Sequence, residues 1–214
     1  MEYVAGGSLH GYLKSHQSRR LPEEECKRIF KQVVEGIRYC HNRSITHRDI
    51  KLENLLLDDD KNMKIIDFGF STCIPNEKRV KIFCGTPSYM APEIVNKTEY
   101  CGPPADVWAL GVLLFTMLCG CFPYRGSTDS ELYGKISNAE YKIPTDIYTS
   151  LSTDAIELIA TLFSINADKR PTAKEVLSHP WLIDVSLPRE KKHACLQMRA
   201  HSSQPQKVQE PTLI

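Results

Sequence analysis

The stretch that decides the fold is "HRDIKLENLLLDDDKNMKIIDFG", residues 47–69. Two short apolar runs, residues 55–57 and 63–66, flank a polar, acidic turn, and this pattern is typical of a β-hairpin. The turn lacks the glycine and the closing glutamate of a calcium-binding loop, so a solvated turn is favoured over a calcium site. A hairpin brings its two ends back together, and we therefore expect Asp67 to lie beside Asn54.

The polar side chains of this stretch suit phosphoryl transfer. Asn54 and Asp67 offer hard oxygen ligands for Mg²⁺, which keeps several waters and takes the rest of its shell from phosphates. Asp49 is left to orient a hydroxyl group and accept its proton, while Lys51 can neutralise charge on the transferring phosphoryl group. Positioning and electrostatics supply nearly all that this chemistry needs.

Helical patterns surround the hairpin. Leu9, Tyr12 and Leu13 are spaced for a short helix capped by Ser8. A long amphipathic helix is expected to begin at Pro22 and to end near Asn42, with acidic residues in its first turn. A buried helix is expected at residues 105–121, and shorter helices at residues 127–137, 152–163 and 172–178.

Composition excludes several classes of protein. The 214 residues suit one or two domains with a hydrophobic core. A formal net charge of +1 gives no reason to expect a nucleic acid or an anionic membrane as partner. The sequence has no basic-then-apolar leader and no apolar stretch of about 18 residues, so neither secretion nor membrane spanning is expected.

The eight cysteines are scattered, except for the close pair Cys119 and Cys121. No second pair and no His-x-His motif completes a metal site around them, so buried free thiols are favoured over zinc. Reduced thiols are typical of intracellular proteins. We therefore expect a cytoplasmic protein, with the nucleus as a further compartment.

Ordered motifs carry a resemblance to a known family. They are "HRD" at residues 47–49, Lys51, Asn54, "DFG" at 67–69, "CGTPSYMAPE" at 84–93, "DVWALGV" at 106–112 and "DKRPT" at 168–172. With these motifs the chain resembles the eukaryotic protein kinases from residue 1 to about Leu182. "HRDIKLENLLLD", "IIDFGFS" and "SHPWL" are similar to the group that contains the calmodulin-dependent, AMP-activated and microtubule-affinity-regulating kinases.

The resemblance implies a mainly α fold: the C-terminal lobe of a protein kinase, a helical bundle with short β-hairpins at the catalytic loop. It implies a hinge at residues 1–7, the C-terminal lobe at 8–182, and a polar, disordered tail at 183–214. Met1 then falls at the gatekeeper position. The N-terminal lobe, with its glycine-rich loop, strand lysine and helix glutamate, is expected to be absent.

The resemblance also assigns roles to single residues. Asp49 is implied to be the catalytic base, and the remaining catalytic residues are Arg48, Lys51, Asn54 and Thr86. Thr86 is expected to bond toward Asp49 and Lys51. ATP is expected to contact Glu2, Val4, Glu53, Leu56, Ile66 and Asp67, and Mg²⁺ is expected to bind Asn54 and Asp67. A buried ion pair between Glu93 and Arg170 and a brace from Asp106 below the catalytic loop are implied as architectural features.

Three positions depart from the family pattern. Ile82 stands where the group usually carries a phosphorylatable threonine whose phosphate Arg48 grips, so activation by that route is not expected. Ser71, Thr72 and Ser88 are other hydroxyls of the segment, favoured as ordinary loop residues. Ser8 and Thr116 replace acidic residues of relatives that prefer arginine in their substrates, and Glu53 remains. Weaker selection for basic peptides is therefore expected.

The sequence thus predicts a monomeric serine/threonine protein kinase that moves the γ-phosphoryl group of ATP to protein substrates, with Mg²⁺ as cofactor. The alternative is a catalytically silent large lobe that binds substrates or regulators. A small-molecule kinase is disfavoured, because it would not need Thr86-Pro87, the "APE" anchor at residues 91–93 or Arg170. Because the strand lysine and the loop amides are missing together, the isolated chain is expected to bind ATP weakly.

Overall fold

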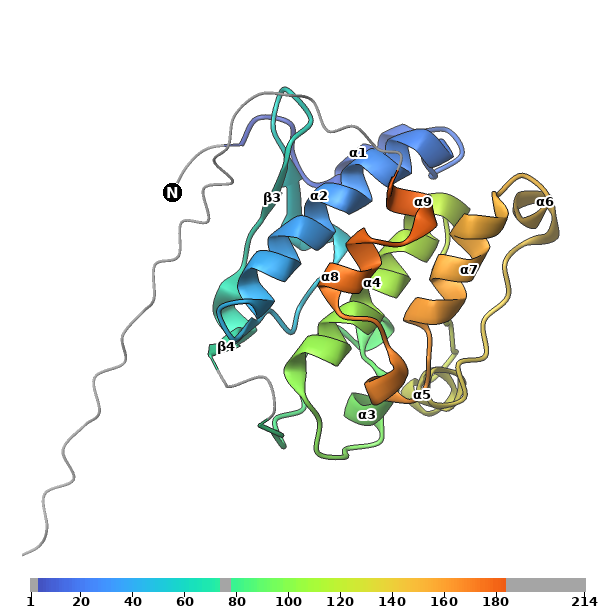
Figure 1. Ribbon diagram of the computed structural model, residues 1–214. Coiled ribbons are helices and arrows are strands. Elements are labelled where there is room, and N and C mark those ends of the chain that lie inside the picture. Colours follow the sequence, from blue (N-terminus) through green and yellow to red (C-terminus); the bar gives the residue numbers. More distant parts are fainter. Residues whose placement is uncertain (1–3, 74–77, 184–214) are drawn as a thin grey trace, which may run out of the picture.

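The computed structural model describes residues 4–73 and 78–183, which form a mainly helical fold (Figure 1). Its nine described α-helices are α1 (Leu9–Ser15), α2 (Glu23–His41), α3 (Pro92–Val95), α4 (Gly102–Cys119), α5 (Asp129–Ser137), α6 (Thr145–Tyr148), α7 (Thr153–Leu162), α8 (Ala173–Leu177) and α9 (Pro180–Ile183). Helix α4 lies in the middle of the bundle, and α2 and α7 both pack against it.

Helix α4 forms the centre of the core. Every residue from Ala105 to Cys119 is buried, as expected of a helix that is apolar on all sides. Our expectation that no apolar stretch reaches the length of a membrane span is wrong, because α4 has 18 residues with a mean hydropathy of 1.4. Within the fold, however, 89% of this helix is buried. The helix begins before the predicted residue 105 because prolines occupy its first turn, where they are well tolerated.

The amphipathic helix predicted after Pro22 is confirmed as α2. Its apolar positions, among them Ile29, Val33 and Ile37, are buried, and three glutamates occupy its first turn. The predicted cap of α1 is also confirmed, since the Ser8 hydroxyl accepts a hydrogen bond from the Gly11 amide at 3.1 Å. The helices predicted at residues 127–137, 152–163 and 172–178 correspond to α5, α7 and α8. Helices α3, α6 and α9 were not predicted.

The predicted hairpin is confirmed. Strand β2 (Leu55–Leu57) pairs antiparallel with β3 (Met63–Ile65), with Leu55 opposite Ile65. In the turn, the Asp58 carboxylate accepts hydrogen bonds from the amides of Asp60 and Asn62 at 3.0 and 2.8 Å.

A second two-stranded sheet was not predicted. Strand β1 (Ile45–Thr46) pairs antiparallel with β4 (Thr72–Cys73). The two sheets enclose the segment between them: residues 47–54 leave β1 and enter β2, and residues 66–71 leave β3 and enter β4. Both polar loops are therefore held at each of their ends.

The seven cysteines in the described part of the chain are free thiols. Cys119 of the close pair is buried and Cys121 is half-buried. Burial raises the pKa of Cys119 to about 12 and that of Cys40 to about 11, so both thiols stay protonated at neutral pH.

Candidate active site

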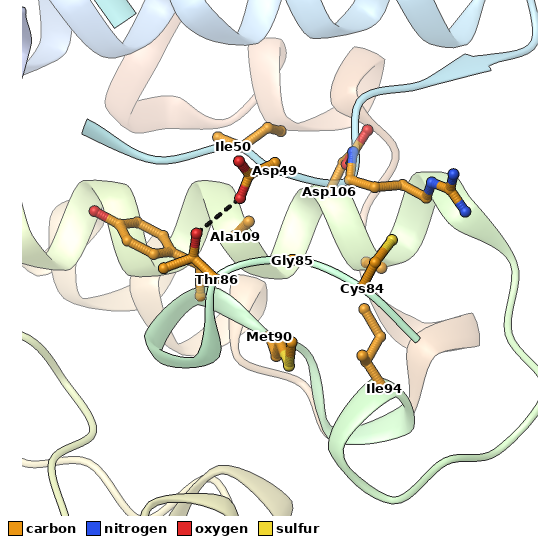
Figure 2. A pocket seen from close by; sticks show the side chains of 12 residues that line it. Asp49, Ile50, Cys84, Gly85, Thr86, Met90, Ile94, Asp106 and Ala109 are labelled. Atoms are coloured by element: carbon orange, nitrogen blue, oxygen red, sulfur yellow. Dashed lines mark hydrogen bonds between the residues drawn. The ribbon is translucent and has the colours of Figure 1, made fainter. Parts of the chain in front are cut away.

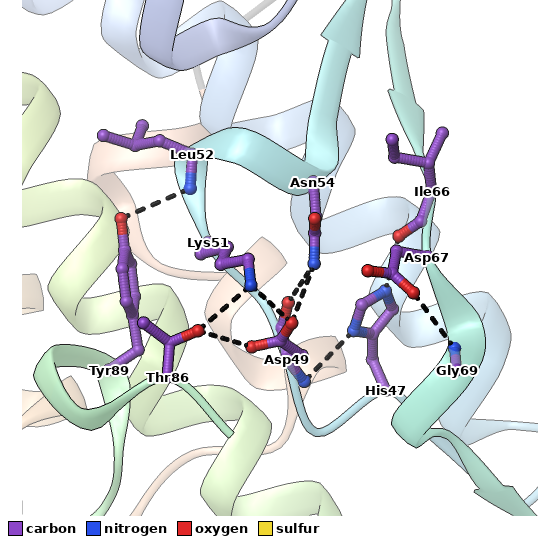
Figure 3. Close-up of polar contacts among 10 residues, drawn as sticks. All are labelled: His47, Asp49, Lys51, Leu52, Asn54, Ile66, Asp67, Gly69, Thr86 and Tyr89. Carbon is purple, nitrogen blue, oxygen red and sulfur yellow. Dashed lines mark hydrogen bonds and ion pairs between the residues drawn. The ribbon is translucent and has the colours of Figure 1, made fainter.

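Asp49 is the centre of the polar cluster (Figure 3). Its buried carboxylate accepts a hydrogen bond from Lys51 Nζ at 2.7 Å and from the Thr86 hydroxyl at 2.8 Å. The Lys51 ammonium also donates to Thr86 Oγ1 at 3.1 Å, and Asn54 Nδ2 donates to Asp49 Oδ2 at 3.1 Å. The predicted contact of Thr86 with Asp49 and Lys51 is confirmed.

These donors set the charge of Asp49. Burial raises the pKa of the carboxyl group, but the hydrogen bonds from Lys51 and Thr86 and the charge of Lys51 outweigh burial and hold the pKa below its ordinary value of 3.8. Asp49 is therefore ionised at neutral pH, next to a cation and with a hydroxyl group fixed against it.

Asp106 of α4 holds the backbone of the loop that carries Asp49. Its carboxylate, 1% exposed, accepts the amide of His47 at 2.9 Å and the amide of Arg48 at 2.8 Å. Arg48 has a φ of 66°, in the left-handed region that non-glycine residues rarely occupy. The brace expected from Asp106 is confirmed, and it compensates the strain at Arg48.

The hairpin places Asp67 at the same site. The Ile66 amide donates to the Asn54 carbonyl at 3.0 Å, so the residue after Ile66 leaves the sheet next to Asn54 (Figure 3). Asp67 has a φ of 61°, and its Oδ1 accepts the Gly69 amide at 3.3 Å. From the other side, His47 Nε2 donates to the Ile66 carbonyl at 3.0 Å.

Asn54 and Asp67 can supply oxygen ligands of the kind that a magnesium ion prefers. Asn54 Nδ2 donates to the Asp49 carbonyl at 2.9 Å as well as to the Asp49 carboxylate. These two bonds orient the amide group, which leaves its oxygen as the atom available to a cation. Asp67 is exposed and supplies a carboxylate oxygen. One amide oxygen and one carboxylate leave room for the phosphate and water oxygens that Mg²⁺ takes as further ligands.

A glycine brings Thr86 to Asp49. Gly85 has a φ of 124°, and a Cβ atom there would lie 3.0 Å from the Arg48 carbonyl. The segment that carries Cys84, Gly85 and Thr86 therefore passes directly against the Asp49 loop, and a small pocket lies between this segment and α4 (Figure 2).

The ion pair expected between Glu93 and Arg170 is confirmed. Arg170 donates from two nitrogens to the two carboxylate oxygens of Glu93, each at 2.7 Å. The guanidinium also donates to the Pro104 carbonyl at 3.0 Å and lies 5.0 Å from the Trp108 ring centroid. The pair joins the end of the Thr86 segment to α4.

Arg48 and Ile82 each bond to another residue of the fold, and Ile82 offers no hydroxyl group for a phosphate. Arg48 Nε donates to the Phe70 carbonyl at 2.5 Å. The Ile82 side chain is 55% exposed, and its carbonyl accepts a hydrogen bond from the Tyr100 hydroxyl at 2.8 Å. Val80 and Tyr100 also exchange two backbone hydrogen bonds. Backbone contacts to Tyr100 thus hold this part of the segment.

The remaining predicted site residues are those expected to contact ATP. Leu56 lies half-buried in β2, Ile66 follows β3, and Val4 is the first residue that the structure describes. Glu53 is exposed, with a carboxylate oxygen 3.6 Å from His10 Nδ1. Met1 and Glu2 lie outside the described residues.

Thr116, one of the positions that depart from the family pattern, lies inside α4. It is 5% exposed within α4, and its hydroxyl donates to the Val112 carbonyl at 2.8 Å. Sequence reasoning also missed His41 and Tyr100, each of which contacts a residue of the site. In the sequence, each of these two residues is only a polar side chain among apolar neighbours, and this pattern does not reveal which residue it bonds to.

The family model of the protein kinase domain matches residues 1–182. The chain belongs to the protein kinase family. It is 43% identical over 182 residues to NUAK family SNF1-like kinase 1 of Mus musculus, covering 85% of this chain and 27% of the relative. The Homo sapiens protein of the same name is also 43% identical over 182 residues, again covering 85% of this chain, and 26% of the relative. Probable serine/threonine-protein kinase MARK-C of Dictyostelium discoideum is 39% identical over 181 residues, covering 85% of this chain and 23% of the relative.

This kinase chain spans about a quarter of the length of the relatives it matches. The described residues have the mainly helical architecture of a kinase C-terminal lobe, as predicted. The resemblance to AMP-activated and microtubule-affinity-regulating kinases is confirmed, since SNF1-like and MARK kinases are among the relatives.

Proposed function

We propose that this chain carries the large lobe of a serine/threonine protein kinase, which transfers the γ-phosphoryl group of ATP to hydroxyl groups of protein substrates. The observation that carries the proposal is the Asp49 carboxylate, which is buried and held by Lys51, Thr86 and Asn54 at the site where Asp67 arrives. Membership of the protein kinase family supports it, and the similar protein MARK-C is named a probable serine/threonine-protein kinase.

Asp49 orients the substrate hydroxyl in this proposal. Because its carboxylate is ionised at neutral pH, it accepts a hydrogen bond from the incoming hydroxyl and directs the oxygen lone pair toward phosphorus. As the bond from the hydroxyl oxygen to the γ-phosphorus forms, the bond from that phosphorus to the β,γ-bridging oxygen breaks, ADP leaves, and the hydroxyl proton passes to Asp49. A low pKa makes Asp49 a weak base, which suits a transition state in which the proton leaves late.

Lys51 and Thr86 keep Asp49 in place and shape the charge around it. The Lys51 ammonium contacts both Asp49 and Thr86, so its positive charge lies where negative charge develops on the transferring group. Asn54 and Asp67 would hold Mg²⁺, which when bound neutralises phosphate charge. ATP would contact Glu2, Val4, Glu53, Leu56 and Ile66.

The test compares the full-length natural protein with its Asp49→Asn variant. Each is incubated with Mg²⁺, γ-labelled ATP and a mixture of peptides, and the labelled amino acids are identified. We expect phosphoserine and phosphothreonine from the wild type and a loss of at least about a thousandfold in the variant. Thermal unfolding verifies that the variant is folded. A folded wild type without transfer, which is the expectation for a silent binding lobe, overturns the proposal, and so does equal transfer by the variant.

Protein substrates, a monomeric state and a cytoplasmic or nuclear location are further parts of this proposal.

A further inference from the structure

Glu53 presents an acidic group beside the proposed reaction site. It belongs to the short 3₁₀ helix Leu52–Asn54, and its side chain is 45% exposed. The residue before it, Leu52, donates its amide to the Tyr89 hydroxyl at 3.3 Å, and the residue after it, Asn54, bonds to Asp49 (Figure 3). A peptide whose hydroxyl group lies at Asp49 would therefore have an exposed carboxylate within reach of its flanking side chains.

Helix α1 packs against this short 3₁₀ helix and brings His10 to Glu53. His10 Nδ1 lies 3.6 Å from Glu53 Oε1, which is within the range of an ion pair but beyond that of a hydrogen bond. The His10 side chain is 37% exposed, so it lies at the surface together with the carboxylate. The imidazole ring stands beside the carboxylate in either protonation state, and the protonated ring adds a positive charge.

The start of α1 fixes the position of His10. On one side of it, Leu9 is fully buried in the core. On the other side, the Gly11 amide donates to the hydroxyl of Ser8, the residue that caps the helix. Ser8 also pairs with Leu56 of β2, the strand that follows the short 3₁₀ helix. The contact between the ring and the carboxylate therefore joins two segments whose backbones are already held together.

The charges of α1 do not favour a basic peptide. Its seven residues, "LHGYLKS", include one histidine, one lysine and no acidic residue. Lys14 is exposed and follows His10 by four residues, so the two side chains lie on one face of the helix. A basic side chain that approaches Glu53 along this face would meet the His10 ring and, one turn away, the Lys14 ammonium group.

We propose that His10 is a specificity-determining residue: it covers and partly balances the Glu53 carboxylate, and so lowers the advantage that a basic side chain of the peptide would gain there. This inference rests on the proposed function, because it concerns a peptide that is placed with its hydroxyl group at Asp49. Exposed ion pairs are weak, so the expected effect on peptide selection is about two- to fivefold.

The test measures how much one arginine improves a peptide. A short peptide of alanine and glycine around a single serine is used, and one arginine is moved through the flanking positions. The arginine effect is the ratio of kcat/KM with and without this arginine, measured on the full-length natural protein with saturating Mg·ATP. At the most responsive position, we expect the effect to be about two- to fivefold larger in His10→Ala than in the wild type. His10→Lys, which fixes a positive charge beside Glu53, should not enlarge it.

Two further variants show whether the gain passes through Glu53. In His10→Ala/Glu53→Gln the gain should disappear, because the acidic group is gone. Lys14→Ala is the matched control, since it removes a cation from the same face of α1 while His10 stays beside Glu53, and it should enlarge the arginine effect less than His10→Ala does. Equal gains in Lys14→Ala and His10→Ala would show that only the overall charge matters and would overturn the inference. A gain that survives in the double variant would overturn it too.

A binding measurement separates this inference from the proposed function. The same peptides, with the serine replaced by alanine, are titrated into the full-length wild type and His10→Ala by calorimetry, so no transfer is needed. Arginine is expected to tighten binding to His10→Ala about two- to fivefold more than binding to the wild type. An arginine effect that is equal in the two proteins, or absent from both, overturns the inference even if the protein is an active kinase. If the wild type is inactive, the proposed function fails and the binding result alone decides about His10.

Discussion

Thr86 and Asp49 are 37 residues apart in the sequence, yet the Thr86 hydroxyl donates to Asp49 Oδ1 at 2.8 Å. The contact joins the segment that begins at Cys84 to the loop that carries Asp49, and Lys51 donates a hydrogen bond to both partners. Thr86 on one segment thus helps to orient the Asp49 carboxylate on another and to keep it ionised.

Removal of the Thr86 hydroxyl is expected to impair catalysis. Thr86→Val keeps the shape of the side chain but leaves Asp49 and Lys51 without their shared partner, so kcat of the full-length protein should fall about 10- to 100-fold. Thr86→Ser, which restores the hydroxyl, should retain most of the rate. Steady-state kinetics with saturating Mg·ATP measures both variants, and equal rates for Thr86→Val and the wild type would contradict the assigned role.

The ion pair between Glu93 and Arg170 is expected to be a large contributor to stability. Arg170 is fully buried, so Arg170→Leu leaves the Glu93 carboxylate without its partner and should lower the free energy of unfolding by about 3 to 5 kcal/mol. The double variant Glu93→Leu/Arg170→Leu should be less destabilised than the sum of the two single variants. Urea unfolding, followed by tryptophan fluorescence, measures all four proteins. Additive effects of the two substitutions would show that the pair is not coupled.

Much of the site was predictable because its determinants are local. A hairpin with a short polar turn can be identified from its two apolar runs, and closing it necessarily returns Asp67 to Asn54. The long α2 helix follows from a 3.6-residue period with acidic residues at its start. The contacts of Thr86, Asp106 and Arg170 came from family resemblance instead.

Other features depend on contacts between segments that are distant in the sequence. Strands β1 and β4 have two residues each, too few for any alternation to be visible. The partner of His41 lies 65 residues away, and a histidine at the end of an amphipathic helix looks like an exposed residue.

Glu23 is expected to give the fold an acid-sensitive contact. Its carboxylate accepts hydrogen bonds from the amide and hydroxyl of Ser152 and from Trp181 Nε1, and so joins the start of α2 to α7 and α9. Burial raises the pKa of Glu23, but the bonds from Ser152 and Trp181 outweigh burial and hold it below the ordinary value of 4.5. Because the folded pKa is the lower one, the stabilisation is present above pH 4.5 and is lost as the pH falls through the folded pKa.

A comparison of the wild type with Glu23→Gln measures this contact. At about pH 7 the variant should be less stable by about 1 kcal/mol, a modest value because Glu23 is partly exposed to solvent. The difference should shrink at an acidic pH below 4.5, as the pH falls through the folded pKa and the wild-type carboxyl group takes up its proton. Urea unfolding at both pH values is the measurement, and a difference that stays constant with pH would contradict the assignment.

Tyr100 is expected to hold the Ile82 segment in place of a phosphate. Tyr100→Phe removes the hydrogen bond to the Ile82 carbonyl, and trypsin should then cleave more rapidly after the exposed Lys78, Arg79 and Lys81. Tyr148→Phe is the matched control, since Tyr148 is 52% exposed. Equal cleavage rates in Tyr100→Phe and the wild type would show that the hydroxyl does not hold the segment.

A related expectation concerns activation. Because Ile82 has no hydroxyl group, active full-length protein should carry no phosphate between Asp67 and Glu93. Mass spectrometry of the active protein tests this, combined with phosphatase treatment. Stoichiometric phosphate in this segment, together with loss of activity after its removal, would contradict phosphorylation-independent activity.

The isolated 214-residue chain is expected to bind Mg·ATP weakly. Leu56, which we propose as the floor of the ATP site, is half-buried, and ligand sites commonly bury about 70 to 90% of a small ligand. Protein kinases commonly contact the phosphates with a strand lysine and a glycine-rich loop, and losing one charge-stabilising donor costs about 10² to 10³ in rate. Calorimetric titration with Mg·ATP and a peptide-phosphorylation assay should therefore show weak binding and almost no turnover. Micromolar affinity with ordinary turnover would mean that Asp49, Asn54 and Asp67 suffice for the reaction without such donors.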